Sequence, residues 1–369
     1  MGDMILMTAV ARRLSERFDA PCDVIASQGS PQLVFHGLPW IGDVFTIQSR
    51  RWNYWISREQ QDLVRQLRRR GPSPTFVLDE LEKVRWLLER AGLTEPLCLR
   101  NGGSHAPNRA DLEHQLDFGL RLASAGSFPE LGVDADWSRV PAPVHHCPEL
   151  LVDDLEREDC EAWLEGNGWH DRPLVLIQAL SRRRRRGRWA TPSWQRLVEA
   201  IRNRLPDVRI LLIGSGEEAA LLKRLCNEIA DPSVSTVAGQ LPLRRLFALL
   251  ERAHSCVSID TGPAHAAAAL GCPLVVLMGR ADPRRNVPRG PAPIAVCTAY
   301  DGSDCGPEVQ WPEHWPATRL QWETEHQLQD IPADVVVQRW LDVANDGTRK
   351  AAERAIGRTV ESRQPSSAS

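Results

Sequence analysis

The sequence predicts an α/β protein of two domains, each with a mainly parallel sheet between helices. Three observations support this: the length, the composition, and the alternation of strand and helix patterns. At 369 residues the chain exceeds the usual size of a single hydrophobic core. Hydrophobic residues make up 42% and charged residues 25% of the chain, as is typical of globular proteins.

The second half of the chain alternates short apolar runs with helical patterns, as a doubly wound parallel sheet requires. Strands are expected at residues 174–178, 208–213, 234–237, 256–259 and 274–278. Helices are expected between them at 193–204, 217–230, 242–252 and 263–270. Beyond residue 297 the pattern becomes irregular until an amphipathic helix at 333–345.

The first half repeats this alternation less regularly. Helices are expected at residues 5–18, 58–70, 81–91 and 109–124, and strands at 22–26, 44–47, 75–78 and 96–99. A proline-rich passage at 141–148 and an acidic helix at 153–165 separate the halves. We therefore expect two Rossmann-like domains facing a cleft. Their predicted bounds are 1–150 and 173–330, with a linker at 151–172, a C-terminal helix at 331–346 and a polar, disordered tail at 347–369.

Charge and composition exclude several classes of protein. A net charge of −3 gives no global field for nucleic-acid binding. No apolar run reaches the ~20 residues of a membrane span, and the N-terminus lacks a secretory pattern, so we expect a cytoplasmic protein. The nine cysteines form no C-x-x-C pair. We expect Cys297 and Cys305 to be free thiols rather than a disulfide or a metal site.

The stretch "VSIDTGPAHAAAALGCPLVVLMG" at residues 257–279 predicts strand, turn, short helix, turn and strand. Pro263 suits the start of the helix and Gly271 its end. Asp260, Thr261 and His265 then lie at the carboxyl end of a parallel strand, where a helix N-terminus favours anions. A helix cap beside a buried histidine is the alternative interpretation.

A dinucleotide-dependent oxidoreductase is a second hypothesis, because "GSGEEA" at residues 214–219 follows a strand and matches G-x-G-x-x-A. That fingerprint needs an acidic residue about 20 positions further on, at the end of the next strand. The next strand ends instead at Ala238 and Gly239, which disfavours this hypothesis.

A nucleic-acid or anionic-lipid binder is a third hypothesis, based on the run of arginines at residues 182–186 and on Arg188. Only three basic residues, at positions 83, 223 and 350, are lysines, so an arginine cluster carries less weight here, and a solvated loop or local anion site is favoured. Asp134 and Asp136 form a D-x-D triplet of the kind that holds a metal. They follow no recognisable strand, and we interpret them as turn residues.

Four segments together resemble one family. They are "GDMILMTAVARRL" at 2–14, "RWATPSWQRLV" at 188–198, "GSGEE" at 214–218 and "DTGPAHAAAALGCP" at 260–273. Over most of its length the chain resembles glycosyltransferase family 9, the ADP-heptose lipopolysaccharide heptosyltransferases. The resemblance implies the GT-B fold of two Rossmann-like domains. It also implies that the turn at Asp260 holds the diphosphate and sugar of the donor.

The resemblance implies Asp3 as the general base, which would take the proton of an acceptor hydroxyl during an inverting displacement. An N-cap of the first helix is the alternative role for Asp3. The donor-binding residues that the resemblance implies are Ser181, Arg186, Arg188, Glu218, the backbone near Leu241, Asp260, Thr261, Gly262 and His265. A lysine common in the family is replaced by Gly187, and Arg186 or Arg188 is expected to substitute for it.

The resemblance further implies heptose transfer from ADP-heptose to the inner core of lipopolysaccharide, with peripheral contact to the inner membrane and no metal or other cofactor. Family members differ in substrate, so another nucleotide sugar or glycan acceptor is the alternative. Arg50, Arg51, Trp52 and Trp55 mix charge and aromatic surface that suits an anionic sugar chain at a membrane. A helix-packing segment is the alternative for these residues.

The position of Asp3 leads to an expectation about the start of the chain. A doubly wound domain begins with a central strand that leads into the turn carrying the active-site residue, whereas only Met1 and Gly2 precede Asp3. The first strand is therefore apparently missing. We expect Met1 to be an internal methionine of a longer reading frame that encodes this strand upstream.

Overall fold

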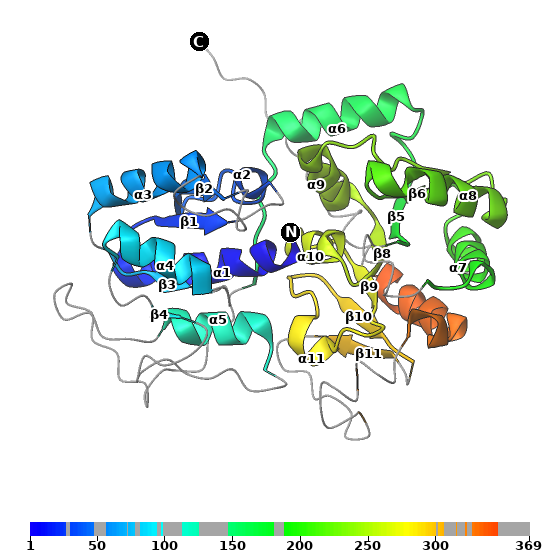
Figure 1. The fold of residues 1–369 in the computed structure, drawn as a ribbon. Helices are drawn as coiled ribbons and strands as arrows, with labels where there is room; N and C mark the ends of the chain where they lie inside the picture. Colours follow the sequence, from blue (N-terminus) through cyan, green and yellow to red (C-terminus); the bar gives the residue numbers. More distant parts are fainter. Residues whose placement is uncertain are drawn as a thin grey trace, which may run out of the picture. The chain divides into compact units, whose positions relative to one another are not determined.

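The structure is a computed structural model in which the chain divides into two compact units, Asp3–Leu151 and Val152–Ser369. We call them the N-terminal and C-terminal units, and Figure 1 shows the elements of both. The structure describes residues 1–26, 30–47, 57–71, 73–77, 82–93, 97–98, 113–124, 147–180, 188–299, 302–305, 315, 322 and 327–345. Among these residues, no helix is both long enough and apolar enough to span a bilayer.

The C-terminal unit is built on one seven-stranded sheet with the order β11-β10-β9-β8-β5-β6-β7. All neighbouring strands are parallel except β10 and β11. The strands are β5 (Leu174–Gln178), β6 (Arg209–Leu212), β7 (Val234–Thr236), β8 (Ser255–Ile259), β9 (Leu274–Leu277), β10 (Ile294–Cys297) and β11 (Gly302–Cys305). Every residue of β5, β8, β9 and β10 is buried, as expected for a parallel sheet covered on both faces.

Helices cover both faces of this sheet. One face packs against α7 (Thr191–Arg204), α8 (Ala219–Ile229) and an unlabelled helix at 333–345, drawn in orange in Figure 1. On the other, α9 (Leu243–Arg252) contacts α10 (Gly262–Ala269), and α6 (Asp154–Gly166) contacts α9. Ion pairs join α6 to α9, including Arg245–Asp159 at 2.7 Å and Arg252–Glu161 at 3.1 Å.

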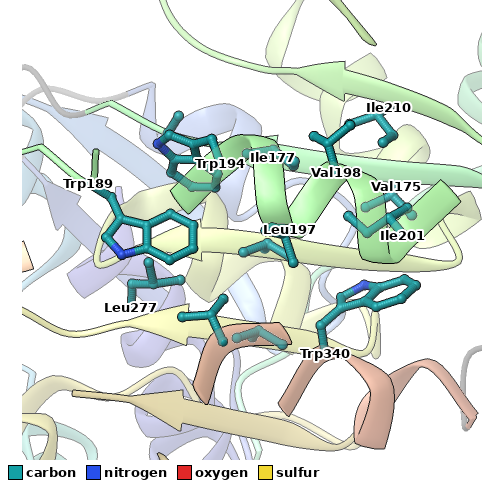
Figure 2. Close-up of a cluster of buried hydrophobic side chains, with 14 of the residues drawn as sticks. Val175, Ile177, Trp189, Trp194, Leu197, Val198, Ile201, Ile210, Leu277 and Trp340 are labelled. Carbon is teal, nitrogen blue, oxygen red and sulfur yellow. The ribbon is translucent and has the colours of Figure 1, made fainter. Parts of the chain in front are cut away.

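Tryptophans anchor the first of these two faces (Figure 2). Trp194 of α7 stacks edge-on against Trp189, with ring centroids 4.7 Å apart. The indole of Trp189 donates to the Ile331 carbonyl at 2.8 Å, and that of Trp340 donates to Ser255 Oγ at 3.1 Å. The helix at 333–345 is therefore held to the sheet by buried polar contacts as well as by apolar packing.

The N-terminal unit contains two parallel strand pairs among its described residues, β1 (Cys22–Ala26) with β2 (Ile41–Thr46), and β3 (Phe76–Val77) with β4 (Leu97–Cys98). Its helices are α1 (Gly2–Phe18), α2 (Pro31–Val34), α3 (Arg58–Arg70), α4 (Glu82–Ala91) and α5 (Gln115–Ala123). Leu6, Ala9 and Val10 of α1 pack against Leu116 and Leu120 of α5.

The α/β class and the parallel sheet are confirmed. The predicted strands of the C-terminal unit agree with the structure to within one residue at each end, and the helices α9 and α10 do so too. The first helix begins at Gly2 rather than at residue 5. The strands β10 and β11 were not predicted. The sequence from 346 onward lies outside the described residues.

Candidate functional site

The predicted site residues that the structure describes in the C-terminal unit gather mainly at the carboxyl ends of neighbouring strands. In the sheet order, β8 lies beside β5, and β5 lies beside β6. The turn after β8 carries Asp260, Thr261 and Gly262, and the turn after β6 leads to Glu218. Since all three strands are parallel, both turns lie at one edge of the sheet, where open α/β sheets bind ligands.

The turn between β8 and α10 leaves backbone donors without partners. Thr261 is the N-cap of α10, but its side chain does not cap the helix. Its hydroxyl donates instead to the Ile259 carbonyl at 3.2 Å. Within the described residues, the N–H groups of Thr261 and Gly262 donate no hydrogen bond. Together with the helix dipole, these N–H groups form a place for an anion.

Small residues allow α10 to lie close to its neighbours. Ala264 and residues 266–269 are buried. A Cβ on Gly290 would lie only 1.8 Å from the Ala268 carbonyl oxygen, so the chain at Gly290 touches the helix backbone directly. Gly271 ends the helix with φ +66°, as the sequence predicts. His265 is 6% exposed, so its imidazole is buried at the first turn of α10.

A buried carboxylate marks the turn after β6. Glu218 ends a 3-10 helix, Gly216–Glu218, and is 7% exposed. Its Oε2 accepts from the Ser215 N–H at 2.7 Å and from the Ser215 hydroxyl at 2.9 Å, whereas its buried Oε1 has no hydrogen-bond partner. Burying a carboxylate oxygen without a hydrogen-bond donor costs free energy. The Oε1 of Glu218 is therefore available to accept a hydrogen bond from a ligand.

Glycines bring two turns of this edge together. Gly239, after β7, has φ +75°, and a Cβ at this position would lie 2.8 Å from Gly216 Cα. Its N–H donates to the Gly214 carbonyl at 2.9 Å. Leu241, predicted to line the base pocket, is two residues further on and half-buried. The backbones after β6 and β7 therefore touch, with no room for a side chain between Gly216 and Gly239.

Asp3 lies in the N-terminal unit. It is exposed, within the first turn of α1, and Met1 is the N-cap of that helix. The alternative role of Asp3 as the N-cap is therefore wrong: the helix begins one residue before it, and Asp3 is an interior residue of the first turn.

Several predicted residues lie outside the described part of the chain. They are Ser181, Arg186, Arg50, Arg51, Trp52 and Trp55, together with Asp134 and Asp136. Arg188 is described and exposed, next to the buried Trp189. The structure thus brings Glu218, Asp260, Thr261, Gly262 and His265 to the carboxyl side of one sheet.

Sequence reasoning missed polar residues at the same edge. Gln178, the last residue of β5, is 4% exposed, and a glutamine ending an otherwise apolar strand was the available indication. Asp282, 2% exposed, binds the Arg284 guanidinium in the segment after β9, with Nη2 2.7 Å from Oδ2. No motif in the sequence indicates that pair.

The buried thiols do not offer a nucleophile. Burial raises the pKa of Cys160 to about 12 and that of Cys297 to about 12, and the pKa of Cys256 is also raised by burial. These thiols are protonated at neutral pH, and Cys297 is a free thiol, as expected. These three thiols are therefore poor nucleophiles.

Comparison with known proteins finds matches to the part of the chain that carries these turns. The family model of glycosyltransferase family 9 (heptosyltransferase) matches residues 143–314, which include the turns after β6 and β8. A curated relative, lipopolysaccharide heptosyltransferase 3 of Escherichia coli, is 27% identical over 94 residues. That match covers 26% of this chain and 28% of the relative, so it spans less than a third of either protein.

Solved structures match over a much larger part of the chain. A family 9 glycosyltransferase from Veillonella parvula matches with a TM-score of 0.72 and 14% identity, covering 94% of this chain and 95% of that one. The ADP-heptose lipopolysaccharide heptosyltransferase II of E. coli matches with a TM-score of 0.65 and 17% identity, covering 94% and 96%. At these identities the structures establish a shared fold, the GT-B fold. Residues 143–314 therefore match the glycosyltransferase family 9 (heptosyltransferase) model, and the chain as a whole shares the fold of these solved structures.

Proposed function

We propose that the protein is an inverting, metal-independent glycosyltransferase that moves a heptose from ADP-heptose to the inner core of lipopolysaccharide. The observation that carries the proposal is the turn between β8 and α10. Its two unbonded N–H groups, at Thr261 and Gly262, lie in the segment that matches the family. A diphosphate is the part of a nucleotide sugar that such a turn would bind.

The donor-binding roles follow the chemistry of each group. The N–H groups at the α10 terminus and the Thr261 hydroxyl would bind the diphosphate, helped by Arg186 or Arg188 and by Ser181. Glu218, with its unpartnered Oε1, would accept from the ribose. Asp260 and His265 would contact the donor sugar, and the backbone near Leu241 would line the adenine pocket.

Catalysis would combine a base with stabilisation of the leaving group. Asp3 would take the proton from the acceptor hydroxyl as that oxygen attacks the anomeric carbon. The bond from that carbon to the diphosphate breaks in the same step, and negative charge develops on the leaving ADP. N–H donors fixed at the helix start would stabilise this charge without reorganising.

The acceptor side is proposed on the N-terminal unit. Arg50, Arg51, Trp52 and Trp55 would bind the anionic core sugars, and the protein would act at the cytoplasmic face of the inner membrane in peripheral contact with it. Another nucleotide sugar or glycan acceptor remains the second candidate, because members of the family differ in substrate.

Calorimetry against ADP-heptose and a panel of ADP-, GDP- and UDP-sugars tests the proposal. We expect ADP-sugars to bind most tightly, and Glu218→Gln to weaken binding about tenfold by weakening a hydrogen bond to a charged acceptor. Glu217→Gln is the matched control, since Glu217 is the exposed neighbour. Binding of NAD but of no nucleotide sugar would favour an oxidoreductase instead.

A further inference from the structure

The side-chain carbonyl of Gln178 is a buried acceptor with no donor. Gln178 ends β5 and is 4% exposed. Its Nε2 donates to the Leu180 carbonyl at 2.5 Å, which fixes the orientation of the amide. Its Oε1 is buried and has no hydrogen-bond partner. The unpaired Oε1 therefore costs the protein free energy that a methionine of similar size would not cost.

This carbonyl lies between the two groups already described at the edge of the sheet. Gln178 pairs in register with Ser258 of β8, three residues before Thr261. On the other side of β5, the Ile213 N–H donates to the Ile177 carbonyl, five residues before Glu218. β5 therefore ends between the strand that leads to the α10 N-terminus and the strand that leads to the Glu218 carboxylate.

The face of the sheet agrees with this location. Val175 and Ile177 of β5 belong to the core shown in Figure 2. Because side chains alternate along a strand, Gln178 points to the opposite face, as does Ser258. On that face α10 contacts β8 and β9, and α9 contacts α10. The Gln178 amide thus lies on the side of the sheet from which α10 begins.

The chemistry of the unpaired groups changes along this edge. After β8 the groups without partners are N–H donors, which suit phosphate oxygens. At β5 and after β6 they are acceptors, Gln178 Oε1 and Glu218 Oε1. Neither acceptor can form a hydrogen bond with an ionised phosphate, because the phosphate oxygens carry no proton to donate. Hydroxyl groups are the donors that a nucleotide presents next to its phosphates.

We propose that Gln178 is a donor-binding residue whose side-chain carbonyl accepts a hydrogen bond from a ribose hydroxyl of the nucleotide sugar. The proposal rests on the function proposed above and extends it. The diphosphate lies over the end of β8, and the ribose lies over the ends of β5 and β6. Gln178 and Glu218 then hold the two hydroxyls of the ribose.

The test removes the Gln178 side-chain carbonyl by mutation and a ribose hydroxyl by using a deoxy nucleotide, first separately and then together. Calorimetry compares ADP, 2′-deoxy-ADP and 3′-deoxy-ADP on the wild-type chain, on Gln178→Met and on the control Gln338→Met. Gln338 is exposed on the helix at 333–345. We expect Gln178→Met to bind ADP about 5–10-fold more weakly. For one of the two deoxy analogues, the wild type should bind about 5–10-fold more weakly than it binds ADP. Gln178→Met should bind that same analogue less than twofold more weakly than it binds ADP.

A second measurement separates binding from folding. Without ligand, Gln178→Met should melt close to the wild-type temperature, because removing the unpaired buried carbonyl offsets the loss of the hydrogen bond to the Leu180 carbonyl. Each hydroxyl penalty is a ratio within one variant, so a general loss of structure does not imitate the expected result.

The outcomes separate the two proposals. The proposal for Gln178 is wrong if the wild type binds ADP and Gln178→Met binds it equally well. It is also wrong if Gln178→Met loses as much affinity as the wild type when either hydroxyl is removed, which is the result expected if Oε1 accepts from a water instead of from the ribose. If the wild type binds no nucleotide, the proposed function fails and the role of Gln178 fails with it.

Discussion

Thr261 uses its hydroxyl in a way that is unusual for an N-cap. A threonine in this position commonly accepts a hydrogen bond from the second or third N–H of the helix. Here the hydroxyl donates back to the Ile259 carbonyl at 3.2 Å and lies 3.4 Å from Ser258 Oγ. The Ala264 N–H bonds to the Thr261 carbonyl instead. The N–H groups of Thr261 and Gly262 are therefore left for a ligand.

Asp3 provides a prediction about catalysis. Asp3→Asn should retain donor affinity and lower transfer by about 10²–10⁴-fold, the range typical for loss of a general base. Steady-state kinetics with ADP-heptose, alongside calorimetry of the donor, measures both quantities. Asp19→Asn is the matched control, because Asp19 follows the same helix in a left-handed conformation that asparagine also adopts. Unchanged turnover in Asp3→Asn would contradict the role of base.

His254 provides a prediction about pH. Burial, and then the charge of Arg204, lowers the pKa of His254 to about 4 from 6.5. The unfolded chain therefore binds the proton more readily, and the free energy of unfolding falls as the pH decreases from about 6.5 to about 4. The contribution of this shift is about 3 kcal/mol. Urea unfolding measures the free energy of unfolding at pH 7 and at pH 4.5. Between these pH values it should decrease less for His254→Gln than for the wild type, and an equal decrease in the two proteins would contradict the prediction.

At the scale of elements, the sequence predicts buried parallel strands well and other elements less well. β5, β8 and β9 are apolar runs between turn residues, and their limits follow from composition. β10 was missed because Ile294–Cys297 is only four residues long and has a proline-rich passage before it. β11, Gly302–Cys305, pairs antiparallel with it, and neither its composition nor its spacing resembles a strand. It forms by pairing with β10, a contact that no local sequence pattern indicates.

The candidate site was predictable to a similar extent. Glu218, Asp260 and Thr261 came from motifs, since their spacing is local. The role proposed for Gln178 was not predicted, because it depends on a side-chain carbonyl without a hydrogen-bond partner, which only the folded structure shows. The pair of Asp282 and Arg284 likewise needs the folded segment after β9 to exclude water from it.

The contact between α10 and Gly290 gives a prediction about packing. Gly290→Ala would place a Cβ 1.8 Å from the Ala268 carbonyl oxygen, so the backbone must move. We expect a loss of about 1–3 kcal/mol in the free energy of unfolding, and weaker donor binding through displacement of the α10 N-terminus. Chemical denaturation and calorimetry measure the two effects.

Gly166→Ala is the opposite case. Gly166 is the last residue of α6, and nothing lies within 4 Å of the Cβ it would gain. Here we expect a gain of about 0.4–1 kcal/mol, because alanine restricts the unfolded chain. If both variants lost stability to the same extent, the close contact at Gly290 would not explain the first result.

At the scale of the whole molecule, the fold is better determined than the substrate. The parallel sheet, its turns and the family domain are encoded locally, and the sequence predicts them. The acceptor is not, because the predicted acceptor residues at 50–55 belong to no motif and lie outside the described residues. Donor identity likewise depends on a few contacts around the proposed diphosphate-binding turn, whose backbone N–H groups do not distinguish one nucleoside diphosphate from another.

The way the diphosphate is neutralised leads to a prediction for the whole enzyme. In the proposed mechanism the leaving ADP is stabilised by the N–H groups at Thr261 and Gly262, by the dipole of α10 and by arginine from the run that ends at Arg188. These groups are part of the chain, so transfer should not depend on a divalent cation. We expect the rate of heptose transfer to remain within about twofold in excess EDTA, and to be unchanged by added Mg²⁺ or Mn²⁺. The double variant Asp134→Asn and Asp136→Asn should behave in the same way, since the mechanism gives the D-x-D triplet no role. If EDTA abolished transfer and Mn²⁺ restored it in the wild type but not in the double variant, the triplet would hold a catalytic metal, and the helix N-terminus would be only one part of the diphosphate site.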